Sequence, residues 1–98
     1  MKRIFLLLVF LSFGACAHHY DTVLHKIGNA TYMIRWARQA GAAKQAPEFY
    51  GEARSLQKKA QAEHKKHSLI KAEALALQAY DAAKQARDQA LSATGKKF

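Results

Sequence analysis

Apolar residues recur at spacings of three and four along three stretches of the chain, which is the pattern of helices with one buried face. In residues 21–41 the stripe consists of Val23, Leu24, Ile27, Ala30, Ile34, Ala37 and Gly41. The second stripe consists of Phe49, Ala53, Leu56, Ala60, His64 and His67. The third consists of Leu69, Ile70, Leu75, Leu77 and Tyr80, continued by Ala79, Ala83, Ala86 and Ala90. The chain is therefore predicted to form three helices.

The predicted ends of these helices carry residues that are typical of such positions. Asp21 suits the start of the first helix, where a carboxylate stabilises the free amide groups. Gly41 ends or interrupts that helix. Pro47 suits the first position of the second helix, because a proline there loses no helical hydrogen bond. The third helix is predicted to begin at Ser68 and to end at Gly95.

These helices predict one all-α domain over residues 21–95, followed by a tail over residues 96–98. The connections between them are short, so neighbouring helices are expected to run antiparallel. The predicted fold is a short up-down-up three-helix bundle, or a long helical hairpin with a looser first helix, after a cleaved signal peptide. Valine, isoleucine and threonine occur after residue 35 only as Ile70 and Thr94, which excludes a sheet-rich fold.

The first fifteen residues have the pattern of a targeting signal. Lys2 and Arg3 precede an apolar run, IFLLLVFLSF, over residues 4–13. As a helix this run would be about 15 Å long, which is half of the ~30 Å hydrocarbon core of a membrane. A signal peptide over residues 1–15 is therefore predicted in place of a transmembrane anchor.

The residues after this run resemble a lipobox, the processing signal of bacterial lipoproteins. Gly14 and Ala15 supply the small residues of that signal, and Cys16 stands at its lipidation position. The resemblance implies cleavage before Cys16, a diacylglycerol on its thiol and a short lipidated tether over residues 16–20. Ala17 stands where a retention signal has aspartate. The resemblance therefore implies an outer-membrane lipoprotein whose domain faces the periplasm.

A second cleavage site leaves an alternative open. Ala15-Cys16-Ala17 also fits the ordinary signal peptidase, which would release a soluble secreted form that begins at His18. Phe13 departs from the lipobox pattern, which prefers leucine at that position. The chain is thus expected to be lipidated at Cys16 or to be cut after Ala17.

Basic side chains outnumber acidic ones by 16 to 7, which gives a formal charge of +9 and favours anionic partners. Five lysines gather near the predicted turn between the second and third helices: Lys58, Lys59, Lys65, Lys66 and Lys71. Because the second helix returns toward the lipidated end, we expect these lysines to lie near anionic headgroups. An ordinary solvated face is the alternative. No aromatic platform for bases accompanies them, so nucleic acid is not an expected partner.

Two histidines offer a second candidate site. His64 and His67 are three positions apart, so a helix would place both imidazoles on one face, where they could bind Zn²⁺, Cu²⁺ or Ni²⁺. Two ligands do not complete a metal site, and the alternative is that both residues form the polar end of the second stripe. No cofactor is therefore predicted. The sequence has no hydrolase elbow, phosphate loop or paired-acid site, so no enzymatic activity is expected.

Trp36 and Tyr32 lie four positions apart, outside the strict stripe of the first predicted helix. Two interpretations are open. The pair could widen the apolar face that packs against the third helix, or it could form a patch that binds a partner.

Several short motifs in the predicted helices resemble one bacterial family. They are Ala40-Gly41-Ala42, Ala46-Pro47-Glu48, Ala53, Leu56, Ala60, Ala72, Leu75-Ala76, Ala79 and Asp81-Ala82. This pattern, which spans residues 33–93, resembles domain-of-unknown-function family 4398. The turn Lys66-His67-Ser68-Leu69 departs from the Gly-Asp-Tyr-like turn that is frequent in that family. The resemblance implies a small lipoprotein of a Gram-negative envelope and brings no catalytic residue.

The sequence as a whole predicts a lipid-anchored envelope protein with a non-catalytic structural or protein-interaction role. The expected partners are the membrane, through the lipid anchor, and another envelope protein or a peptidoglycan-associated protein. Alanines bury little apolar surface, so a second copy of the chain is a further expected partner. The alternative function is a periplasmic protein that binds a metal or a small ligand through its histidines.

Overall fold

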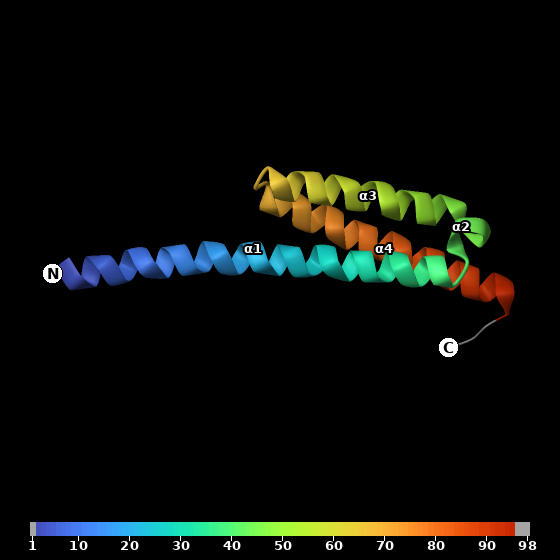
Figure 1. Cartoon of the computed structure of the whole chain (residues 1–98), viewed down its shortest axis with the longest axis horizontal. Coiled ribbons are helices and arrows are strands. Elements are labelled where there is room, and N and C mark those ends of the chain that lie inside the picture. Colours follow the sequence, from blue (N-terminus) through green and yellow to red (C-terminus); the bar gives the residue numbers. More distant parts are fainter. Residues whose placement is uncertain (1, 96–98) are drawn as a thin grey trace.

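The computed structural model describes the backbone of residues 2–95 and the side chains of residues 21–95. Residues 2–95 form helices and no strand: α1 (Lys2–Gln39), α2 (Ala42–Gln45), α3 (Pro47–Lys65) and α4 (Leu69–Thr94). After α1, helix α3 runs back along the molecule and α4 runs forward again (Figure 1). Helix α4 packs against both α1 and α3. The predicted all-α, up-down-up three-helix bundle is thus confirmed, with α2 as a single turn between two long helices.

Helix α1 is longer than predicted. The sequence predicts a start at Asp21, whereas the helix begins at Lys2 and passes without a break through the predicted signal peptide and tether. Residues 2–20 contain no proline and a single glycine, Gly14, so little in their sequence ends a helix. The first part of α1 extends beyond the other helices (Figure 1). Cleavage and processing at residues 15–20 stay predictions.

The other helix ends follow the predicted signals. Gly41 lies between α1 and α2 with a left-handed φ of 93°. Pro47 is the first residue of α3, and Ser68 immediately precedes α4. Gly95 ends α4 with a φ of 73°. A side chain disfavours this left-handed conformation, which accounts for glycine at both positions.

Alanine dominates the core. Thirteen of the sixteen buried apolar residues within residues 21–95 are alanines, and the other three are Val23, Ile27 and Met33. The main buried stripe of α4 consists of Ala72, Ala76, Ala79, Ala83, Ala86 and Ala90. Its alternating spacings of four and three form a heptad repeat, which keeps one seam facing the neighbouring helices. Because alanine side chains are short, the helix axes can approach one another closely.

The core is layered along the bundle, and the layers fix how α1 and α4 are aligned. Val23 and Ala72 share the layer nearest the α3–α4 turn. Ala37 and Ala86 share the layer at the opposite end. The direct contacts Lys26–Glu73 and Trp36–Arg87 join positions that are 47 and 51 residues apart, so α1 and α4 run parallel and in step. A residue of α4 therefore lies level with the α1 residue about 49 positions earlier.

Several large apolar residues of the predicted stripes are exposed, so their predicted inward position is wrong. Leu24 exposes 50% of its surface, Ile70 81% and Leu77 47%. Each lies one or two positions from a buried valine or alanine of the seam. The smaller residue occupies the seam because closely spaced helices leave no room for a larger side chain.

A buried glutamine links α3 to α1. Gln57 Nε2 donates hydrogen bonds to the Ile27 carbonyl oxygen at 2.8 Å and to Thr31 Oγ1 at 2.6 Å. Thr31 Oγ1 donates to the same Ile27 carbonyl at 3.1 Å. This contact adds a directional bond between helices whose alanines bury little area. The predicted apolar stripe of this helix contained Leu56. It did not include Gln57, because that residue is polar.

The alanine seam can be tested by overpacking. Ala83 is fully buried, so Ala83→Leu should force the helices apart and lower the free energy of unfolding by about 1–3 kcal/mol. Ala74 is exposed on the same helix. Ala74→Leu is therefore the matched control, with an expected change within about 0.5 kcal/mol. Thermal unfolding followed by circular dichroism measures both variants, and equal melting midpoints would contradict the close-packed seam.

Candidate functional site

The turn between α3 and α4 has the hydrogen bonds of a Schellman motif. The Ser68 amide donates to the Glu63 carbonyl oxygen at 2.9 Å, and the His67 amide donates to the His64 carbonyl oxygen at 3.0 Å. His67 occupies the left-handed position of the motif, with a φ of 61°. These bonds close α3 at Lys65 and direct the chain into α4 within three residues.

The five lysines predicted to form one cluster are all exposed, but they lie in two groups. One group lies in or beside the turn and consists of Lys65, Lys66 and Lys71. We call residues 65–71 the basic turn. Lys58 and Lys59 lie about 10 Å further along α3, because each helical residue adds ~1.5 Å. The predicted cluster of five lysines is therefore a group of three at the turn. Lys58 and Lys59 lie apart from this group, within α3.

The basic turn lies level with the part of α1 that precedes the bundle. By the offset of about 49 positions, Ile70 in the first turn of α4 lies level with Asp21. The turn end of the α3–α4 hairpin lies beside the middle of α1 (Figure 1). The predicted return of the chain toward its start is thus confirmed. The side chain of Cys16 lies outside the described residues, so its lipidation stays a prediction.

The two histidines of the candidate metal site differ in burial and in backbone conformation. His64 is buried on the inner face of α3, near the end of the helix. His67 is exposed in the basic turn, because α3 has already ended at Lys65. The prediction of one shared helix face is therefore wrong, whereas His64 fits the alternative of a polar end to the inner stripe. Within the described residues no group of three potential metal ligands occurs.

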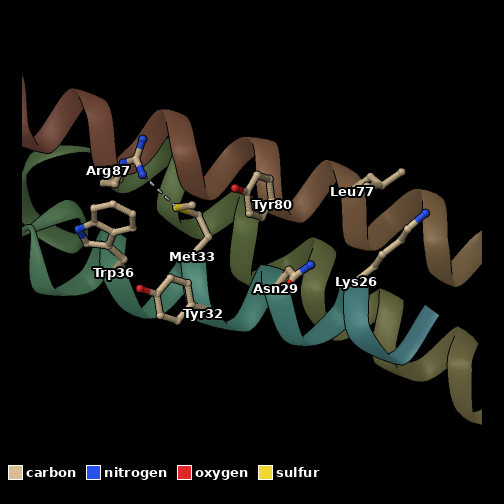
Figure 2. A pocket seen from close by; sticks show the side chains of 8 residues that line it. All are labelled: Lys26, Asn29, Tyr32, Met33, Trp36, Leu77, Tyr80 and Arg87. Carbon is tan, nitrogen blue, oxygen red and sulfur yellow. Dashed lines mark hydrogen bonds between the residues drawn. The ribbon is translucent and has the colours of Figure 1, made fainter. Parts of the chain in front are cut away.

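A second candidate surface is a groove of about 510 Å³ between α1 and α4 (Figure 2). Its lining residues are Lys26, Asn29, Tyr32, Met33, Trp36, Leu77, Tyr80 and Arg87. At one end the Arg87 guanidinium lies 4.2 Å from the centre of the Trp36 ring, a cation–π contact. At the other end Lys26 Nζ donates to Glu73 Oε1 at 2.7 Å. The groove thus has an apolar middle and a cation at each end.

The groove contains both Trp36 and Tyr32, and the interpretation of this pair as a partner-binding patch stays a prediction. Trp36 is half-buried and meets Arg87 of α4, so it belongs to the wide apolar face between these helices. Tyr32 exposes 63% of its surface, and its ring lies edge-on to Trp36 with 6.3 Å between the ring centres. Sequence reasoning missed Arg87. Its position one residue after the seam residue Ala86, on the helix predicted to face Trp36, was the available signal.

No family model, curated protein or solved structure matches this chain. The resemblance to domain-of-unknown-function family 4398 therefore stays a prediction from the sequence motifs.

The left-handed residue of the basic turn gives a stability test. A side chain disfavours the conformation of His67, so His67→Gly should raise the free energy of unfolding by about 0.5–1 kcal/mol. His25 is exposed within α1. The control His25→Gly should instead lower the free energy by a few tenths of a kcal/mol, because glycine is a poor helix former. Urea unfolding distinguishes the two, and a loss of stability in both variants would argue against the turn conformation.

Proposed function

We propose that this protein is a lipid-anchored lipoprotein of the bacterial cell envelope, held in the outer membrane through Cys16 and facing the periplasm. The observation that carries the proposal is the leader, in which ten residues dominated by apolar side chains are followed at once by Gly14, Ala15 and Cys16. A run of that length is too short to span a membrane and has the length of a signal peptide. Within the described residues, no helix is both long and apolar enough to cross a membrane.

The continuity of α1 supports a role in spacing. The helix passes through Cys16 and Asp21 and continues to Gln39. The five residues from Cys16 to Asp21 correspond to about 7–8 Å of helix. A helical connection of this length would hold the bundle close to the membrane surface and limit how far it can move away. The proposed protein therefore presents a small rigid bundle at a nearly fixed height.

The lining of the α1–α4 groove supports a binding role without catalysis. It combines aromatic rings, a thioether and two cations. Both cations also have acidic neighbours: Lys26 pairs with Glu73, and Arg87 pairs with Asp88 at 2.8 Å. None of the eight lining residues is a carboxylate, a thiol or an imidazole. Of the other acid–base groups, the lining has Lys26, which pairs with Glu73, and the phenols of Tyr32 and Tyr80. The groove suits an apolar segment of another envelope protein.

The anchor is tested at the cysteine. Cys16→Ala should remove the acylation site and shift the mature protein from the floating membrane fraction of a density gradient to the soluble fraction. The physical reason is that stable attachment depends on acyl chains, which contribute ~0.8 kcal/mol per buried CH₂. Ser12→Ala is the matched control, because it makes a small change in the leader and keeps the thiol. Flotation of the cysteine variant after a high-salt wash would contradict the proposal.

The mass of the mature chain tests the same proposal independently. A lipoprotein should begin at Cys16 and carry the added mass of a diacylglycerol, which intact-protein mass spectrometry measures directly. A chain that begins at His18 without added mass would show cleavage after Ala17 and overturn the anchored form.

A further inference from the structure

The basic turn carries an apolar side chain that the bundle does not use. Ile70, in the first turn of α4, is 81% exposed and is the most exposed large apolar residue within residues 21–95. It borders a shallow hollow of about 440 Å³ lined by residues 67–71. Helical side chains tilt toward the N-terminus of their helix, so Ile70 projects toward the tip of the α3–α4 hairpin.

Three exposed lysines flank this side chain. Lys65, Lys66 and Lys71 are all exposed within five positions of Ile70 in the sequence. Of the nearby acids, Glu73 forms an ion pair with Lys26, whereas Glu63 at the end of α3 and the exposed Asp21 of α1 partly offset the charge of the three lysines. An apolar residue at a tip, flanked by ammonium groups, matches the two layers of a membrane surface, where apolar groups enter the acyl boundary and cations remain among the phosphates.

The alignment of α1 and α4 brings this tip to the proposed anchor. Ile70 lies level with Asp21, five helical residues from Cys16, which corresponds to about 7–8 Å along the axis. The basic turn ends the hairpin at this level, so its lysines lie near the ~8 Å over which charges act at physiological salt. Lys58 and Lys59 lie about 10 Å further along α3, beyond that range.

We propose that the basic turn is a second membrane contact, in which Ile70 inserts into the leaflet that holds the acyl chains of Cys16. Lys65, Lys66 and Lys71 bind the phosphates of anionic headgroups around it. The inference rests on the proposed anchoring at Cys16. A lipid anchor alone allows the bundle to tilt, whereas two contacts at the same end hold α1 and α4 upright on the membrane.

Tryptophan fluorescence tests the insertion in the mature protein, purified from membranes and reconstituted into vesicles of phosphatidylcholine and phosphatidylglycerol. Trp36 is the single tryptophan of the chain, so Trp36→Phe removes the background emission. Ile70→Trp then places a probe at the tip. Its emission should shift to shorter wavelength, and lipids brominated near the headgroup end of their acyl chains should quench it.

Leu77→Trp, in the same Trp36→Phe background, is the matched control. Leu77 is also an exposed apolar residue of α4, about 10 Å further from the turn. The probe there lies beside the α1–α4 groove and should resist quenching by the brominated lipids. Equal quenching at positions 70 and 77 would mean that the bundle lies on its side. The absence of quenching at position 70 would mean that the turn does not enter the leaflet. Either result overturns the inference.

The lysines are tested in the Ile70→Trp background by two sets of three substitutions that remove the same charge. Replacing Lys65, Lys66 and Lys71 with glutamine should reduce the quenching, as should high salt. The second set, which replaces Lys58, Lys59 and Lys84 with glutamine, should leave it nearly unchanged, since these exposed residues lie further from the turn. Equal loss in both sets would indicate attraction by the overall charge and contradict a specific contact at the turn.

Different results would overturn the proposed anchor and the proposed second membrane contact. Intact mass and flotation are measured first on each preparation. A chain without acyl chains overturns the proposed function, and with it the basis of the inference. An acylated chain that floats, but whose probe at position 70 stays unquenched, overturns the second contact alone.

Discussion

The close approach of α4 to its two neighbours is the constraint on which the rest of the structure depends. Its seam is built from alanines, with Ala83 fully buried at the centre. Such a seam gains little from apolar area and more from length and regular contact, because each alanine buries a single methyl group. Larger residues are therefore displaced to the outside of the helices, as Leu77 and Ile70 show. The hydrogen bonds of Gln57 add directional contact between α3 and α1.

The seam also determines which residues lie side by side at each end of the bundle. Because it holds α1 and α4 parallel with a constant offset, the basic turn lies beside the stretch of α1 that leads out of the bundle. A shift of one heptad would move the turn by about 10 Å and separate Ile70 from Asp21. The placement of the lysines near the leader is thus a consequence of core packing, far from the charges themselves.

Sequence patterns predicted the bundle well, and they failed where two residues competed for one position. Pro47 and Gly95 fixed helix ends because their backbone chemistry is local. The pattern could not decide between Val23 and Leu24, because the outcome depends on the distance between helix axes, which is a tertiary property. The prediction that His67 belongs to the second helix failed for a related reason. Glycine is the residue that usually marks the left-handed position at the end of a helix, and a histidine occupies that position here.

The two candidate surfaces are compatible in the proposed anchored state, because the same helices carry both at different heights. The groove begins at Lys26, ten residues after Cys16, which corresponds to about 15 Å along α1. It ends at Trp36, at about 30 Å. A bundle held upright by the basic turn would therefore open its groove sideways, above the headgroups, where a protein segment can reach it. A bundle lying on its side could bring that groove against lipid. In the proposed anchored state, the orientation set by the turn would thus determine whether the apolar lining around Tyr32 meets a protein or the membrane.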